Sequence, residues 1–144
     1  MLTKKIISLL LIIMISIAIL DNQSHGANNL KLHSNGLWVI EKIDGQIPLF
    51  ETGQAIRFHK NGKLSVYVDC NQTVADYIIN QSKKTIRVTN MISTEKSCGG
   101  GMQPDSSITG MIMGIRRYQI YGNRLILITN NGQKLSFLFK ADKN

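Results

Sequence analysis

The segment 63-KLSVYVDCNQTVADYII-79 is the clearest indication of a β fold, because it contains two short runs typical of β-strands. In the first run apolar side chains alternate with polar or larger ones, as expected for a strand with one face turned to a core. This period predicts a shared inner face for four side chains: Leu64, Val66, Val68 and Cys70. The cysteine is therefore expected to point into the protein at the end of a strand.

Turn dipeptides divide the rest of the chain into similar runs. Asp44-Gly45, Asn61-Gly62 and Asn131-Gly132 favour type I′ turns, whose two central residues need positive φ, and Gly122-Asn123 favours a type II′ turn. The intervening runs are rich in β-branched, aromatic or leucine residues. They predict a meander of about eight strands at 37–43, 54–60, 63–69, 73–79, 84–89, 117–121, 124–129 and 134–140.

One segment has the period of a helix. In 103-QPDSSITGMIMGIRR-117 four apolar residues recur at i, i+3, i+4 and i+7, which predicts one buried helix face: Ile108, Met111, Ile112 and Ile115. Gly110 and Gly114 lie one turn apart and are expected to let a strand approach the helix closely.

The first 26 residues have the layout of an export signal. Lys4 and Lys5 precede Ile6–Leu20, a run of 15 uncharged residues, which is shorter than the roughly 20 residues that span a membrane. We expect residues 1–26 to be a signal peptide, 27–35 an N-terminal segment and 36–142 the folded domain of a periplasmic or secreted protein. The alternative is an uncleaved N-terminal membrane anchor.

The chain has two cysteines, Cys70 and Cys98, which we expect to form a disulfide outside the cytoplasm. The bond would enclose 27 residues and contribute roughly 3.5 kcal/mol in the chain-entropy description. A zinc site or a catalytic thiol is a weaker interpretation, because His33 and His59 lie in other sequence contexts. We expect no metal and no cofactor.

The charge pattern argues against two classes of function. Without residues 1–26, which hold Lys4, Lys5 and Asp21, 15 basic and 8 acidic residues remain. The basic pairs Lys83-Lys84 and Arg116-Arg117 have no aromatic platform beside them, so they are interpreted as solvated surface and no nucleic-acid partner is expected. Neither paired carboxylates at a motif spacing, nor a nucleophile elbow, nor a complete phosphate loop is present in the sequence, so we expect no enzymatic activity.

Short motifs follow one another in a set order from the first predicted strand to the helix. A tryptophan precedes a turn glycine and a proline; Cys-Asn is followed by a small residue and an aromatic; a Thr-x-x-x-Cys motif comes next. This order over residues 36–142 resembles the META/HslJ family of small exported or membrane-associated domains. Asp69 and Ala75 stand where that family usually has glycine. The residues that carry the resemblance are Trp38, Gly45, Pro48, Cys70, Asn71, Tyr77, Thr94 and Cys98.

The resemblance implies an α+β fold, a curled antiparallel sheet or cracked β-barrel of about eight strands wrapping one α-helix. It also implies a non-catalytic, monomeric envelope module, which binds a protein partner in a chaperone-like or stress-resistance role. The alternatives are a carrier or sensor of a small apolar ligand or lipid, and a protein similar to secretion pilots. Peripheral contact with a membrane is a further expectation of this kind.

An apolar surface beside the helix is the expected binding site. The run Leu125–Ile128 is apolar on both faces, and Val74 and Ile78 lie opposite the inward side of their strand. The groove is expected to be lined by Ile108, Gly110, Met111, Ile112, Gly114, Ile115, Leu125, Ile126, Leu127 and Ile128. The competing hypothesis is that these residues are core, or that residues 27–36 cover them.

We predict that the mature protein lacks residues 1–26. The intact mass of protein from the native host should then correspond to residues 27–144. A full-length species retained in the membrane fraction would instead support the anchor.

Overall fold

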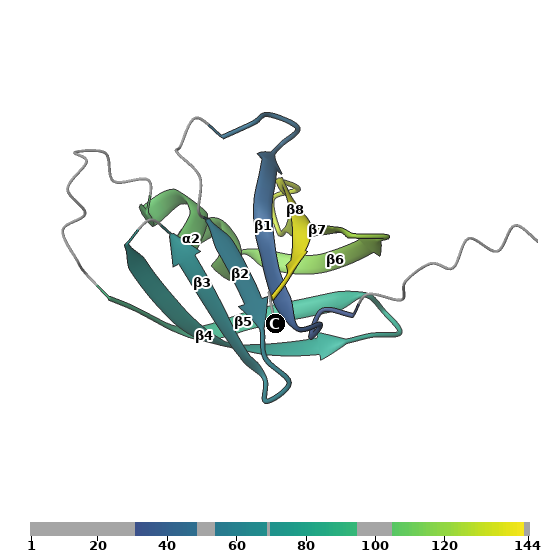
Figure 1. Cartoon of the computed structure of the whole chain (residues 1–144), viewed down its shortest axis with the longest axis horizontal. Helices are drawn as coiled ribbons and strands as arrows, with labels where there is room; N and C mark the ends of the chain where they lie inside the picture. The colour runs from purple at the N-terminus through teal and green to yellow at the C-terminus, as the bar shows by residue number, and fades with distance from the viewer. Residues whose placement is uncertain (1–30, 49–53, 69, 95–104, 143–144) are drawn as a thin grey trace, which may run out of the picture.

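The computed structural model describes residues 31–48, 54–68, 70–94 and 105–142 and is shown in Figure 1. These residues form eight strands and one helix, and all eight predicted strands are present within a few residues of their expected bounds. In chain order the elements are β1 Gly36–Ile43, β2 Ala55–Phe58, β3 Lys63–Val68, β4 Asn71–Asn80, β5 Thr85–Ser93, α2 Asp105–Met113, β6 Ile115–Tyr121, β7 Arg124–Thr129 and β8 Lys134–Ala141.

The sheet is a closed antiparallel barrel in which each strand pairs with its neighbours in the chain. β1 and β8 complete the ring along nearly their whole length, from Gly36 opposite Ala141 to Ile43 opposite Leu135. The prediction of a cracked barrel is wrong in this respect. Because β1 and β8 pair with each other, the first and last strands of the meander present no free edge to other chains.

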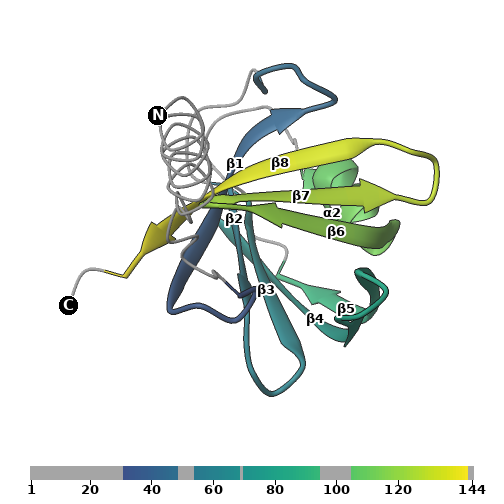
Figure 2. The same ribbon diagram turned by 90° about the vertical axis from the view of Figure 1, so that its right-hand side faces the viewer.

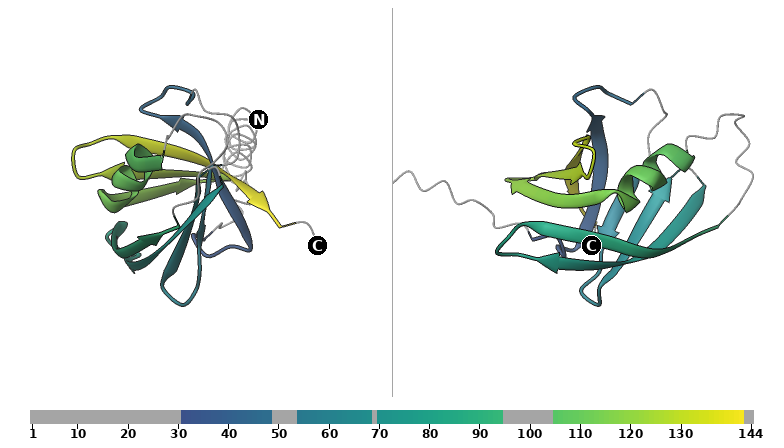
Figure 3. Two further views of the ribbon diagram at one scale, coloured as in Figure 1. Left: turned by 90° about the vertical axis from the view of Figure 1, so that its left-hand side faces the viewer. Right: turned by 180° about the vertical axis from the view of Figure 1, so that it is seen from behind.

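The seam between β5 and β6 is much shorter than the others. Only Thr85 and Arg117 are paired there, whereas β4 and β5 pair from Thr73 opposite Ser93 to Asn80 opposite Thr85. Figure 2 shows the β4–β5 hairpin diverging from β6. The connection between the two strands carries α2, which leads directly into β6 (Figure 3), so it is not a tight hairpin.

The core forms because alternate side chains of most strands point into the barrel. Near the start of β1, Trp38 is fully buried in this core. The indole N–H of Trp38 donates to the carbonyl of Leu32 at 3.2 Å. The ring of Phe139 lies edge-on to Trp38, with ring centroids 5.1 Å apart. Because Phe139 belongs to β8, these contacts join the two ends of the chain across the closing pair of strands.

Two of the three predicted type I′ turns are wrong. Asp44 and Gly45 both have positive φ, at 48° and 81°, as type I′ requires. Gly62 and Gly132 have φ of 78° and 88°, but the asparagines before them do not. In the β2–β3 loop His59 N–H donates to the Lys63 carbonyl and Gly62 N–H to the His59 carbonyl, the pattern of a type I turn followed by a left-handed glycine.

Cys70 does not point into the core, contrary to the prediction. β3 ends at Val68 and β4 begins at Asn71, and these two residues face each other in the ladder. Cys70 therefore lies in the tight turn between the strands, where it is exposed. Strand alternation stops where the chain reverses, so it cannot be extended from Val68 into the turn.

α2 is shorter than the predicted pattern, since it ends at Met113 and Ile115 already belongs to β6. Ile108 and Ile112 join the hydrophobic core, and the helix packs mainly against β5. The expected close approach at Gly110 is wrong, because a Cβ there would meet no atom within 4 Å. This helix is too short and too weakly apolar to span a membrane, and it is the sole helix in the described part of the chain.

Two glycine-to-alanine changes should shift stability in opposite directions. Gly36→Ala should destabilise by about 1–3 kcal/mol, because its Cβ would lie 2.3 Å from the Lys140 carbonyl oxygen across the closing strands. Gly110→Ala should stabilise by about 1 kcal/mol, since it removes the helix penalty of glycine at an open position. Urea unfolding at equilibrium measures both. A neutral Gly36→Ala would show that β1 and β8 do not approach this closely.

Candidate functional site

The expected apolar groove is not open in the structure, because most of its residues are core. Ile108, Ile112, Ile115, Leu125 and Leu127 are buried in the central cluster. On the other face of β7, Ile128 is 7% exposed and Ile126 is half-buried. Met111 is partly buried against the same cluster, while Gly110 is exposed and Gly114 is half-buried. The competing hypothesis, that the apolar run is core, describes these side chains better.

The family-motif residues at the start of β4 act as a structural clamp. The Thr94 hydroxyl donates to Asn71 Oδ1 at 3.2 Å and accepts from the Gln72 N–H at 3.1 Å. The Thr94 N–H in turn donates to the Gln72 carbonyl. These bonds tie the end of β5 to the start of β4, so Asn71 is held across the hairpin.

Tyr77, the aromatic residue of the motif, is buried and joins three segments. Its hydroxyl donates to the His59 carbonyl at 2.7 Å and lies 2.7 Å from His33 Nδ1. A phenol has one proton, so His33 must donate from Nδ1 to the tyrosine oxygen. Its ring meets Phe58 edge-on at 5.1 Å between centroids.

Neither partner of this bond is charged near neutral pH. Burial raises the pKa of Tyr77 to about 12. The pKa of His33 is below its usual value. The main cause is burial, and the positive charges of Lys60 and Lys31 also disfavour a charged imidazole. A neutral donor and a neutral phenol make a structural bond rather than an acid–base pair.

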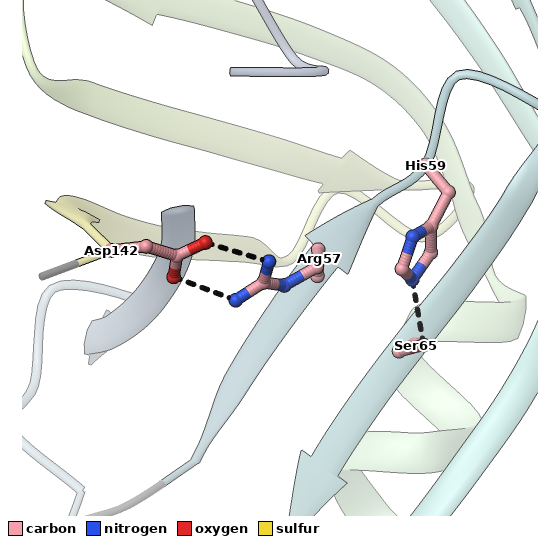
Figure 4. A network of polar contacts seen from close by, with 4 residues as sticks. All are labelled: Arg57, His59, Ser65 and Asp142. Carbon is pink, nitrogen blue, oxygen red and sulfur yellow. Dashed lines mark hydrogen bonds and ion pairs between the residues drawn. The ribbon is translucent and has the colours of Figure 1, made fainter. Parts of the chain in front are cut away.

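The structure brings His33 and His59 into one pocket, although the sequence suggested unrelated contexts. The pocket has a volume of about 390 Å³ and also contains Arg57 in its wall. Figure 4 shows that Arg57 is held by Asp142 through two bonds of 2.9 and 2.8 Å, while His59 Nε2 contacts Ser65 Oγ at 2.9 Å. The bond to Asp142 raises the pKa of Arg57. In the described ranges no three metal-binding side chains gather, here or elsewhere.

A larger cleft opens at the short seam between β5 and β6. We call it the basic cleft. Its volume is about 630 Å³ and its wall contains three arginines from the two strands that diverge there. It is lined by Ile78, Asn80, Thr85, Ile86, Arg87, Arg116, Arg117, Thr129 and Asn130.

No carboxylate among the described side chains neutralises the positive charge of the basic cleft. Arg116 Nη1 donates to the carbonyls of Met113 and Ile115, which fixes its side chain over the end of α2. Arg87 and Arg117 are exposed, and neither has an ion-pair or side-chain hydrogen-bond partner among the residues that the structure describes. Like charges held close together raise the local potential and attract anions.

The carboxylates whose side chains are described all lie outside this cleft. Three form ion pairs, Glu41 with Arg124, Asp76 with Lys63 and Asp142 with Arg57. The fourth, Asp44, accepts the Lys134 backbone N–H at 2.7 Å. The segregation of paired acids from unpaired arginines distinguishes the basic cleft from an ordinary charged surface.

The sequence alone does not reveal this site, because its charged residues are far apart along the chain. Lys83-Lys84 and Arg116-Arg117 were interpreted as two solvated pairs. The pairing of Thr85 with Arg117 places both pairs and Arg87 at one corner of the barrel. The two basic pairs were the available signal, but their meeting depends on the β5–β6 register.

These features define a class of protein, a small antiparallel β-barrel domain with a basic cleft at its shortest seam. The chain belongs to the META domain family, which matches residues 29–142, and the resemblance inferred from the motifs is confirmed. No curated protein sequence matches the chain.

Solved structures share the fold at low sequence identity. A protein from Burkholderia xenovorans, determined by NMR, is 18% identical with a TM-score of 0.59, over 77% of this chain and 86% of that one. A DUF4847 family protein from Bacteroides vulgatus, determined by crystallography, is 13% identical with a TM-score of 0.60, over 77% and 96% of the two chains. At such identities the likeness extends to the fold alone.

The Cys70–Cys98 disulfide stays a prediction, because Cys98 lies outside the described residues. Cys70 itself is not a free thiol and lies in the exposed β3–β4 turn. Non-reducing peptide mapping should recover the linked pair. Cys98→Ser should lower the free energy of unfolding by roughly 3.5 kcal/mol at most, because a cross-link constrains the unfolded chain. Two free thiols in the exported protein would contradict the bond.

Proposed function

We propose that the protein is an exported, non-catalytic binding module of the cell envelope that holds an anionic partner in the basic cleft. The observation that carries this proposal is the meeting of Arg87, Arg116 and Arg117 in one concave site without a described carboxylate. The role is that of an accessory or chaperone-like protein, which acts by binding. The proposed binding site is this charged cleft and not the apolar groove expected from the sequence, because most of the groove residues form the core.

Guanidinium groups suit such a role. Arginine stays charged at all relevant pH values, and its planar donors match the oxygens of carboxylates and phosphates. Arg116 is anchored on the end of α2, whereas Arg87 and Arg117 have no described partner. The cleft therefore offers one fixed and two adjustable guanidinium groups. Anion binding then costs little reorganisation of the barrel itself.

The absence of catalysis is supported by the chemistry of the same wall. Its polar side chains are arginine, asparagine and threonine, which are hydrogen-bonding groups and not bases near neutral pH. The two described histidines lie in the other pocket, where His33 and Tyr77 are engaged in a neutral hydrogen bond. A general base beside a nucleophile is thus not part of the lining of the basic cleft.

A lipid partner is the second candidate. Ile78 and Ile92 are 69% and 76% exposed, and Val74 faces Ile92 on the same outer side of the β4–β5 hairpin. Exposed apolar side chains beside cations suit an anionic membrane surface. Asp76 interrupts this strip, with Lys63 and Asn90 bound to it, which makes the strip less suited to insertion.

Removing two unpaired charges should weaken partner capture. We expect the Arg87→Gln/Arg117→Gln variant to capture its envelope partner at least about tenfold more weakly, since charge-assisted hydrogen bonds are lost. The control is Lys134→Gln/Lys140→Gln, which removes the same charge from exposed side chains of β8. Affinity capture from envelope extract, with mass spectrometry of proteins and lipids, measures both variants at two salt concentrations. Equal capture by the two variants would contradict the role of the cleft.

A further inference from the structure

We infer that the anionic partner is an extended acidic peptide segment, which lies along the β5–β6 seam with its carboxylates on the arginines of the basic cleft. This inference rests on the proposed function, because it names the chemistry of the partner at the same site. Three features carry it: the open seam, the hydrogen-bonding side chains of the wall, and the spacing of the charges.

The seam provides an unpaired length of strand. β5 is paired with β4 from Thr85 to Ser93 with one register shift, but on its other side only Thr85 has a partner strand residue in the described chain. Beyond Thr85 no residue of β5 is paired with β6, and Thr85, Ile86 and Arg87 line the basic cleft, while α2 also contacts β5. An incompletely paired strand is the place where extended peptides bind, through main-chain hydrogen bonds and alternate side chains.

The wall contains groups that suit a peptide backbone better than a simple anion. Asn80 Oδ1 accepts from Ser82 Oγ and the Lys83 N–H, which leaves its amide N–H groups to donate. The Asn130 backbone is held by Gly114, while its side chain lines the cleft. A peptide brings carbonyl oxygens that accept from such amides, so the asparagines and the arginines are used together.

The charge spacing suits an extended chain. Arg117 lies on β6 opposite Thr85, and Arg87 lies two residues beyond Thr85 on β5, so the two arginines are on different strands and are offset by about 7 Å along the strand direction. Side chains on one face of an extended peptide repeat at the same interval of about 7 Å. Carboxylates at positions i and i+2 therefore face the two unpaired arginines in turn.

Apolar residues of the peptide, placed between its carboxylates, also have an apolar contact on the protein. Ile78 faces Arg87 in the β4–β5 ladder and lines the rim of the cleft, where it is largely exposed. An aliphatic side chain of the peptide buries Ile78 on binding. The pattern that fits the site alternates acidic and aliphatic residues. A flat lipid surface would use neither the concave wall nor its asparagines, and it would meet the interrupting Asp76.

A designed peptide tests this pattern directly. The probe is a fluorescein-labelled octapeptide of four Asp-Val repeats, and fluorescence anisotropy with the exported protein measures its affinity. We expect it to bind at least about tenfold more tightly than four Asn-Val repeats, because the neutral peptide loses the charge-assisted bonds. We expect weaker binding by the Asp-Asp-Val-Val-Asp-Asp-Val-Val peptide, which has the same composition but places carboxylates on both faces.

Protein variants locate the site. Arg87→Gln/Arg117→Gln should weaken the Asp-Val probe about tenfold or more, whereas Lys134→Gln/Lys140→Gln should leave its affinity within about twofold. Ile78→Ser should also weaken it, without changing the preference for Asp over Asn. Binding that is insensitive to the arginine changes would overturn the inference.

Other anions distinguish the acidic-peptide inference from the more general anion-binding function. Vesicles with phosphatidylglycerol, vesicles of phosphatidylcholine alone, and inorganic phosphate are tested with the same variants. Arginine-dependent binding to phosphatidylglycerol vesicles or phosphate, with none to either acidic peptide, would reject the peptide and keep the anion-binding function. Equal affinity for the alternating and blocked peptides would reject the extended arrangement. No arginine-dependent binding to any probe would reject both the peptide and the function.

Discussion

The pairing of β1 with β8 is the constraint on which the rest of the barrel depends. It joins strands from the two ends of the chain, and it requires the backbones to approach so closely that Gly36 has no room for a side chain. Trp38 and Phe139 pack across this joint inside the core. Because this pairing joins residues that are far apart along the chain, it carries a larger loop-closure entropy cost than the hairpins between neighbouring strands.

The long closure at β1–β8 explains how the seam at β5–β6 can be short. Ring closure is already held on the other side, and α2 occupies the connection that would otherwise be a hairpin. The two strands diverge beyond Thr85 and Arg117, and the basic cleft lies at this corner. The site is therefore a consequence of inserting a helix into an up-and-down barrel, with walls held by well-paired strands on both sides.

Charge is distributed over this frame in two ways. Three of the described carboxylates form ion pairs with cations that do not line the basic cleft, as Asp142 does with Arg57 and Asp76 with Lys63. The arginines at the seam have no such partners among the described side chains, and exposed ion pairs elsewhere add little stability. Unpaired like charges repel one another, so the arginines at this concave site add no ion-pair stabilisation to the fold, and this is the feature on which the proposed binding of an anion rests.

The sequence by itself determined the strands, most of the turns' positions and the family, because these depend on local alternation, turn residues and short motifs. It also identified Tyr77 and Thr94 as important, although it did not show that they clamp neighbouring segments. The tertiary structure decided which apolar faces are covered: Leu125 and Leu127 are core, not groove. It also decided that Cys70 lies in an exposed turn and that Arg87, Arg116 and Arg117 line one cleft. Local periodicity encodes a strand and its faces, but contacts between residues some 30 positions apart depend on strand register and closure, which arise only when the whole barrel packs.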